Sequence, residues 1–121
     1  MKLSMKLFVM LSLVAVLAGI TYLSLSPQPK MVASNDKIGH FIAYGTLMLH
    51  LGLLYSGNQK RLLIAAIFAF IYGGLMEFGQ WFVPGRSVSA LDLLANTGGV
   101  VIGYVLTLLF GKRVQKLLRM R

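Results

Sequence analysis

The chain has three acidic residues, Asp36, Glu77 and Asp92, and each of them lies in or beside a long apolar stretch. A charged side chain inside a bilayer costs roughly 2.5–3.5 kcal/mol on insertion scales, so such residues are rare and usually have a specific role. His40 and Arg86 lie in similar surroundings. A histidine beside carboxylates can act as a general acid or base, and an arginine can hold a phosphate or carboxylate through paired hydrogen bonds. These side chains are therefore the first candidates for chemistry.

The composition predicts that these residues lie in a membrane protein. Hydrophobic residues make up 57% of the 121 residues, charged residues make up 12%, and the mean hydropathy is +0.76. This charged share is about half that of a soluble domain. The absence of cysteine excludes disulfides and thiolate metal sites. The positions of the basic residues beside the apolar stretches account for the net charge of +9, so we expect no nucleic-acid partner.

Four apolar stretches are long enough to cross a bilayer as helices, at about 7–25, 38–55, 62–82 and 91–110. Helices are expected because backbone polar groups find no partner in lipid. The first stretch follows two lysines, as a signal peptide does, but its apolar run is longer than usual and no cleavage site follows, so we expect it to be retained. Short turn-rich segments separate the stretches, such as the one that contains Gly57-Asn58. The prediction is an all-α, integral membrane, four-helix up-and-down bundle that forms one domain over 1–121.

The basic residues predict how this bundle is oriented. Nine of them fall on one side of the predicted spans: Lys2, Lys6, Lys60, Arg61, Lys112, Arg113, Lys116, Arg119 and Arg121. The other three fall on the opposite side: Lys30, Lys37 and Arg86. The more basic side of a membrane protein is cytoplasmic. We therefore expect an inner (cytoplasmic) membrane protein with both termini and a basic tail at 111–121 inside, and all three carboxylates at the outer leaflet.

Helical spacing places the polar residues on stripes, because residues three or four apart share a face. The three stripes are Asp36–His40–Tyr44, then Gly73–Glu77–Gln80, and then Asp92–Asn96–Gly99–Gly103. Small residues let helices approach closely in a membrane. We therefore expect the stripes of the third and fourth helices to face one another, and the Gly99-x-x-x-Gly103 face to be a candidate surface for a homodimer.

Helix capping is the alternative explanation for two of the acids. Asp36 can offset the positive end of a helix dipole, and Ser89-x-x-Asp92 fits a capping box in which Asp92 reaches back to the helix start. Capping does not explain Glu77, because it lies near a helix C-terminal end, where the dipole disfavours an anion. Glu77 therefore needs a partner, and we expect Arg86 or His40.

The combined motifs resemble the VanZ-like family, small bacterial integral membrane proteins named for a member associated with teicoplanin resistance. The resemblance rests on Asp36-Lys37-x-x-His40-Phe41-x-x-Tyr44, Glu77-x-x-Gln80, Pro84-Gly85-Arg86-Ser87 and Asp92-x-x-x-Asn96-x-x-Gly99, and covers about 36–103. It implies that the family's signature positions are Asp36, Lys37, His40, Glu77, Gln80, Arg86, Asp92 and Asn96. It implies a fold and a membrane location, and no particular reaction.

These residues predict a site that binds or acts on a lipid-linked or other anionic cell-envelope substrate. We assign catalysis to Glu77, His40 and Asp92. Binding is assigned to Arg86, Asp36, Lys37, Gln80 and Asn96. Because no metal-binding motif such as H-E-x-x-H is present, we expect no metal and no cofactor. One histidine and two or three carboxylates could in principle ligate a divalent ion, which is the less favoured alternative. Three alternatives stay open: an accessory protein that binds without turnover, a proton-coupled carrier, and a cluster that only locks the bundle together.

Overall fold

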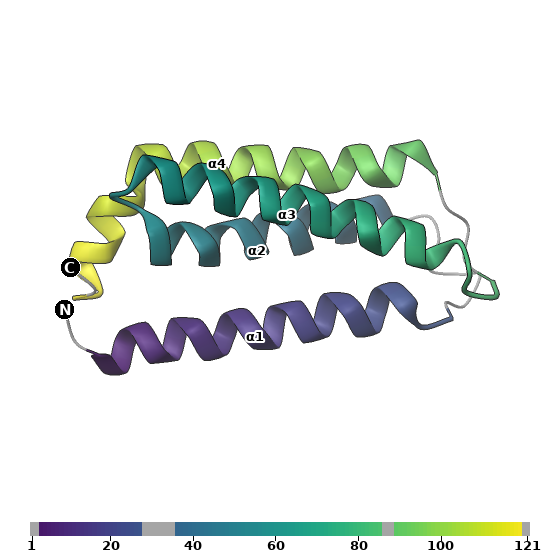
Figure 1. Ribbon diagram of the computed structural model, residues 1–121, viewed down its shortest axis with the longest axis horizontal. Coiled ribbons are helices and arrows are strands. Elements are labelled where there is room, and N and C mark those ends of the chain that lie inside the picture. The colour runs from purple at the N-terminus through teal and green to yellow at the C-terminus, as the bar shows by residue number, and fades with distance from the viewer. Residues whose placement is uncertain (1–2, 28–35, 86–88, 120–121) are drawn as a thin grey trace.

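The computed structural model describes residues 3–27, 36–85 and 89–119. These residues form four α-helices and no strand: α1 (Leu3–Leu25), α2 (Asp36–Tyr55), α3 (Gln59–Gln80) and α4 (Ala90–Leu117). Consecutive helices run in opposite directions (Figure 1). Each helix is long and apolar enough to cross a membrane. The prediction of an all-α, four-helix, membrane-spanning bundle is therefore confirmed.

Turn residues of the expected kinds separate the helices. Gly57, between α2 and α3, has a φ of 105°, a backbone conformation that side-chain-bearing residues rarely adopt. The next residue, Asn58, is the N-cap of α3, and its Oδ1 accepts a hydrogen bond from the backbone N–H of Arg61 at 3.1 Å. Ser89 is the N-cap of α4 in the same way. These caps satisfy N–H groups that have no partner within the helix.

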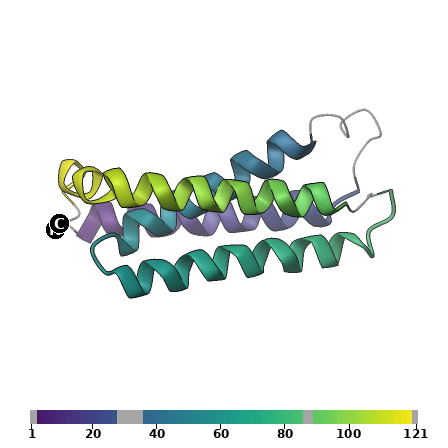
Figure 2. The same ribbon diagram turned by 90° about the horizontal axis from the view of Figure 1, so that it is seen from above.

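Helices α2 and α3 each contact all three of the other helices, and α2 has the more extensive contacts. Its most extensive contact is with α4, which it crosses in Figure 2, whereas α1 packs only on α2 and α3. Glycines allow the α2–α4 approach. A Cβ atom on Gly99 would collide with the backbone of α2, at the carbonyl oxygen of Phe41 and 2.8 Å from the nitrogen of Gly45. A Cβ atom on Gly103 would lie 2.8 Å from the Cβ of Met48.

This packing corrects two expectations about the stripe of small residues on α4. Gly99 and Gly103 face α2 and not α3. Gly45 of α2 has no side chain, so the backbones of α2 and α4 can approach closely there. The same face is filled within the chain, so it is not available for a homodimer. The expected contact between the stripes of α3 and α4 does occur at Gly73 and Asn96. A Cβ atom on Gly73 of α3 would lie 3.4 Å from the Asn96 side chain on α4.

Helix α4 is also longer than expected from its apolar run. The expected end was at 110, but the helix continues through Leu117, so most of the basic tail is helical. The buried stripe continues into this region through Thr107, Gly111 and Gln115. Gln115 donates a hydrogen bond from Nε2 to the carbonyl oxygen of Leu53 at 2.6 Å, and so ties the extension to α2.

The bundle has its large apolar side chains outside and its polar side chains inside. Many leucine, isoleucine and phenylalanine side chains are exposed on the outer surface, as in Phe8, Leu94 and Leu109. The buried polar residues include His40, Glu77, Gln80, Asp92 and Asn96. A lipid environment favours this distribution, because lipid solvates apolar groups and cannot form hydrogen bonds with polar ones.

Candidate functional site

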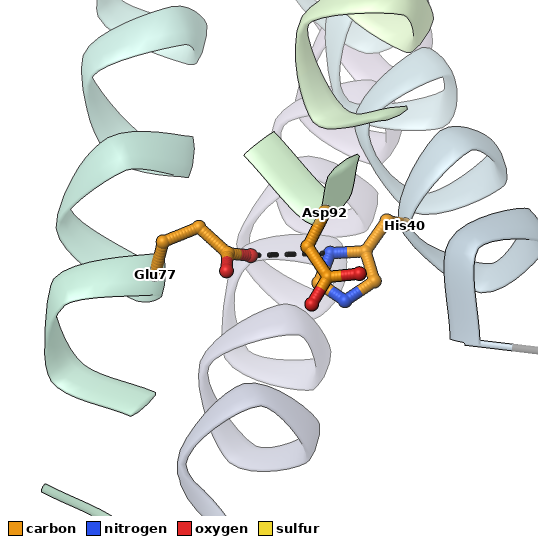
Figure 3. Close-up of side chains that lie close together, drawn as sticks. All are labelled: His40, Glu77 and Asp92. Carbon is orange, nitrogen blue, oxygen red and sulfur yellow. Dashed lines mark ion pairs between the residues drawn. The ribbon is translucent and has the colours of Figure 1, made fainter. Parts of the chain in front are cut away.

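The buried acids gather at the end of the bundle where α2 begins, α3 ends and α4 begins (Figure 1). His40 comes from α2, Glu77 from α3 and Asp92 from α4, and their side chains point toward one another (Figure 3). Each residue offers one nitrogen or carboxylate oxygen, and these three atoms all lie within 4.8 Å of one another. The residues are 9%, 6% and 2% exposed, respectively. Three residues that are far apart in the sequence therefore form one compact cluster.

A chain of hydrogen bonds through Asn96 connects three helices. His40 Nδ1 lies 2.7 Å from Asn96 Oδ1, and Asn96 Nδ2 donates to Glu77 Oε1 at 3.3 Å. His40 Nδ1 is also 3.4 Å from Glu77 Oε1. Both oxygens that face Nδ1 are acceptors, so Nδ1 carries the proton. In the neutral imidazole the lone pair is then on Nε2, which is the nitrogen able to accept a proton or bind a metal ion.

Asp92 has a different environment from the one that a capping box predicts. Ser89 Oγ accepts a hydrogen bond from the Asp92 backbone N–H at 3.3 Å, so the serine half of the box is present. The Asp92 carboxylate, however, is buried beside His40 and Glu77. Within the described ranges its Oδ1 accepts no hydrogen bond, and it forms an ion pair with Lys37, whose Nζ is 3.7 Å away. Capping alone therefore does not explain Asp92.

The cluster has two carboxylates close together in an apolar bundle. Like charges at this distance repel one another strongly when water is excluded. Among the described side chains, Lys37 offers a positive charge to Asp92, but the Lys37 side chain is 50% exposed and its ion pair is correspondingly weak. A proton on His40 or on one carboxylate, or a bound cation, would stabilise the cluster.

The other predicted binding residues are placed as follows. Gln80 is one turn beyond Glu77 at the end of α3 and is 2% exposed. Asp36 is the first residue of α2, but its side chain lies outside the described part of the chain. Arg86, the predicted anion clamp, also lies outside the described residues. The structure thus brings together His40, Glu77, Asp92, Asn96 and Lys37.

Tyr44 is a further candidate that was assigned to a stripe but not to the site. It lies one turn after His40 on α2, is 2% exposed, and its hydroxyl has no hydrogen-bond partner among the described residues. Gly73 links it to the cluster, because a Cβ atom there would lie 3.2 Å from Tyr44 Cε1 and 3.4 Å from Asn96. In the sequence, Tyr44 is four residues after His40, which places both residues on one helix face. A role in apolar packing would give the same spacing.

An apolar groove of about 520 Å³ lies at the other end of the bundle. Its lining residues are Leu51, Tyr55, Arg61, Ile64, Ala65 and Phe68. They come from the end of α2 and the start of α3, far along both helices from His40 and Glu77. The groove is therefore separate from the polar cluster, and we base the candidate site on the cluster because it holds the groups capable of chemistry.

The second histidine of the chain has a structural environment. His50 Nδ1 lies 2.8 Å from the carbonyl oxygen of Thr46, one turn earlier on α2, and must therefore donate to it. Its Nε2 lies 2.8 Å from Ser12 Oγ on α1 and accepts from that hydroxyl. Both ring nitrogens of His50 are thus used in packing α1 on α2. His50 is a natural control for experiments on His40.

Four membrane-spanning helices with a buried histidine–carboxylate cluster at one end define a small multi-pass membrane protein. The chain belongs to the VanZ/LLP1 family, whose sequence profile matches residues 4–111. The resemblance inferred from the motifs is therefore confirmed.

A eukaryotic protein shares part of this sequence. An uncharacterized protein of the fission yeast Schizosaccharomyces pombe, C11E3.10, is 28% identical to this chain over 92 residues. The match covers 74% of this chain and 57% of the yeast protein. The chain therefore spans little more than half the length of this relative. No solved structure is significantly similar to the chain.

Proposed function

We propose that the cluster of His40, Glu77, Asp92 and Asn96 is a site that binds and acts on a lipid-linked anionic substrate at the outer leaflet. One observation carries the proposal: three buried titratable side chains from three helices converge within 4.8 Å at one end of the bundle. Ionisable residues inside a membrane protein usually mark a functional site. The substrate reaches such a site from the bilayer, which suits a molecule with a lipid tail and a polar head group.

The arrangement supports a role for His40 as the general base. Its Nδ1–H is directed at Asn96 and Glu77, which hold the ring and stabilise the imidazolium that forms when Nε2 takes a proton. A base held in this way can remove a proton from a hydroxyl group or water. Lys37 stands at the exposed edge of the cluster and offers a positive charge to an anionic head group. Arg86 remains our predicted clamp for that group.

The distribution of charge supports placing this site outside the cytoplasm. The helix ends that carry His40, Glu77 and Asp92 share one end of the bundle, and Lys60, Arg61 and Lys112 lie at the other end. With nine of twelve basic residues expected at that other end, the positive-inside rule favours both termini in the cytoplasm of a cell bounded by an inner membrane. The cluster then faces the outer leaflet and the substrates assembled there.

Conservative substitutions test the proposal. We expect His40→Gln and Glu77→Gln to abolish complementation of a deletion strain while the protein accumulates to the normal level. His50→Gln, which changes the other histidine, is the matched control and should complement. Membranes with each variant are then incubated with a labelled polyprenyl phosphate and with labelled anionic phospholipids, and both binding and turnover are measured. Full complementation by His40→Gln at normal abundance would show that the cluster is not the functional site.

A purely structural role is the second candidate, and the Asn96 hydrogen bonds favour it. They connect α2, α3 and α4, and so would lock the bundle without any substrate. This role predicts that His40→Gln lowers the melting temperature in detergent and the protein level together. Loss of complementation at unchanged melting temperature separates the functional role from the structural one.

A further inference from the structure

We propose that His40, Glu77 and Asp92 bind a first-row divalent transition-metal ion such as Zn²⁺ or Mn²⁺. The proposal rests on the function proposed above in one respect: the ion would act at the same site and contact the same anionic substrate. With the ion bound, His40 is a ligand and no longer the general base. It replaces the expectation of a metal-free site, which rested on the absence of a metal-binding motif on a single helix. Here the candidate ligands come from three helices, so no sequence motif would reveal them.

The distances suit an ion. A tetrahedral ion with bonds of about 2.0–2.2 Å separates its ligand atoms by about 3.3–3.6 Å. The three candidate ligand atoms lie within 4.8 Å of one another before any ion is bound. Separations at this upper limit would need to shorten by about 1.2–1.5 Å on binding. All three residues are at least nine-tenths buried, so the ion would be shielded from competing water.

The donor set determines the kind of ion. Imidazole favours transition metals, whereas carboxylates alone favour Mg²⁺ or Ca²⁺. Ligation through Nε2 would leave the Nδ1–H of His40 directed at Asn96 Oδ1, which lies 2.7 Å from Nδ1. A metal-bound histidine usually donates its other ring N–H to a neighbouring oxygen in this way, and the bond fixes the ring orientation.

Charge supplies the independent reason for a cation. Asp92 is 2% exposed, and its Oδ1 accepts no hydrogen bond from any residue that the structure describes. Its described ion-pair partner, Lys37 Nζ, is 3.7 Å away on a half-exposed side chain. A divalent ion between Asp92 and Glu77 would neutralise both carboxylates at once. Buried charges are typically paired in this way or bound to metals.

The ion would also resolve an electrostatic difficulty in the proposed function. Two carboxylates repel an anionic head group, and the half-exposed Lys37 offsets the charge of Asp92 only weakly. A divalent ion held by three protein ligands keeps a coordination position open for a phosphate or carboxylate oxygen of the substrate. The class of substrate is therefore a lipid whose head group offers such an oxygen.

Direct binding measurements on the purified full chain test the site without any substrate. The protein in detergent is stripped with a chelator and titrated with Zn²⁺ and with Mn²⁺ in a calorimeter, and the retained metal is measured after desalting. We expect about one ion per chain and a rise in melting temperature on binding. His40→Gln, Glu77→Gln and Asp92→Asn should each weaken the affinity by at least about tenfold. His50→Gln should bind as the unmodified chain does.

Two results would overturn the metal site. One is the absence of both binding and a metal-induced rise in melting temperature in the unmodified chain, a readout that needs no variant to fold. The other is equal affinity in His40→Gln and His50→Gln. If His40→Gln fails to fold, Co²⁺ bound to the unmodified chain replaces that comparison, and a spectrum without imidazole ligation rejects the site. Failure of complementation by Glu77→Gln together with no metal binding would retain the proposed function and reject the ion.

Discussion

His40 Nδ1 on α2 lies 2.7 Å from Asn96 Oδ1 on α4, and Asn96 Nδ2 donates to Glu77 Oε1 on α3 at 3.3 Å. The amide orientation is fixed from both sides, because exchanging its oxygen and nitrogen would place an acceptor against the carboxylate. Asn96 therefore fixes the imidazole with its proton on Nδ1. A single amide side chain sets both the packing of three helices and the chemistry of His40.

Replacing Asn96 with alanine should affect stability and function together. The substitution removes hydrogen bonds to two buried groups, so we expect a loss of about 1–3 kcal/mol in the free energy of unfolding. It also releases the His40 ring, so we expect metal affinity to fall by about 10–100-fold. Thermal melting in detergent and calorimetry measure the two effects.

Thr97→Ala is the matched control for Asn96→Ala. Thr97 is the next residue on α4, and its Oγ1 donates to the carbonyl oxygen of Leu93 in the same helix at 2.9 Å. Loss of this local bond leaves the contacts between helices intact, so the metal affinity should not change. Equal affinities in the two alanine variants would contradict the positioning role of Asn96.

A second prediction concerns the glycines that bring α2 and α4 together. A Cβ atom on Gly99 would collide with the α2 backbone, so Gly99→Ala should force the helices apart and cost about 1–3 kcal/mol of stability. Gly98 is the control, because its Cβ atom would only touch the Phe41 ring at 3.6 Å. Gly98→Ala should be neutral or stabilising by up to about 1 kcal/mol, since alanine favours the helix. Chemical denaturation in mixed micelles distinguishes the two.

The sequence predicted the helices and the residues of the cluster. It did not specify which helices pack together or which side chains form hydrogen bonds with one another. The apolar runs, the Gly57–Asn58 turn and the Ser89 cap are local features, so they could be located from the sequence alone. The convergence of the acids at one end also followed, because alternating helices place Glu77 and Asp92 at the same end.

The choice of helix pairs and hydrogen bonds depends on long-range packing, which the sequence pattern does not specify. The Gly99 stripe could face α2 or α3, and only the collision distances show that it faces α2. Asn96 was placed in the site, but its position between His40 and Glu77 required the orientation of three helices. Helix α4 continues beyond its apolar run to Leu117, and Gln115 in this extension bonds to a carbonyl group on α2.

Lys37 should matter more for substrate than for stability. Its ion pair with Asp92 spans 3.7 Å and the lysine side chain is half exposed, so Lys37→Gln should change the free energy of unfolding by less than about 1 kcal/mol. The variant removes a positive charge from the edge of the site, so binding of a labelled anionic lipid should weaken. Lys60→Gln, at the opposite end of the bundle, is the control for a general loss of charge. An equal loss of lipid binding in both variants would argue against a local role of Lys37.

Tyr44→Phe should lower function without lowering stability. The Tyr44 hydroxyl is buried and has no hydrogen-bond partner among the described residues, so removing it should leave stability unchanged or raise it by about 1 kcal/mol. If the hydroxyl donates to a substrate or to a ligand of the ion, complementation should fall at normal protein abundance. A fall in melting temperature would instead show that the hydroxyl has a partner within the protein.

The proposed orientation can be tested cleanly because the chain has no cysteine. A single cysteine at Pro84, an exposed residue just after α3, should react with a membrane-impermeant maleimide in intact cells. A cysteine at Lys60, exposed at the start of α3, should react only after the membrane is opened. The reason is the charge asymmetry, which favours the Lys60 end in the cytoplasm. The reverse labelling pattern would place His40 and Glu77 at the cytoplasmic leaflet, and the substrate would then have to be sought among inner-leaflet lipids.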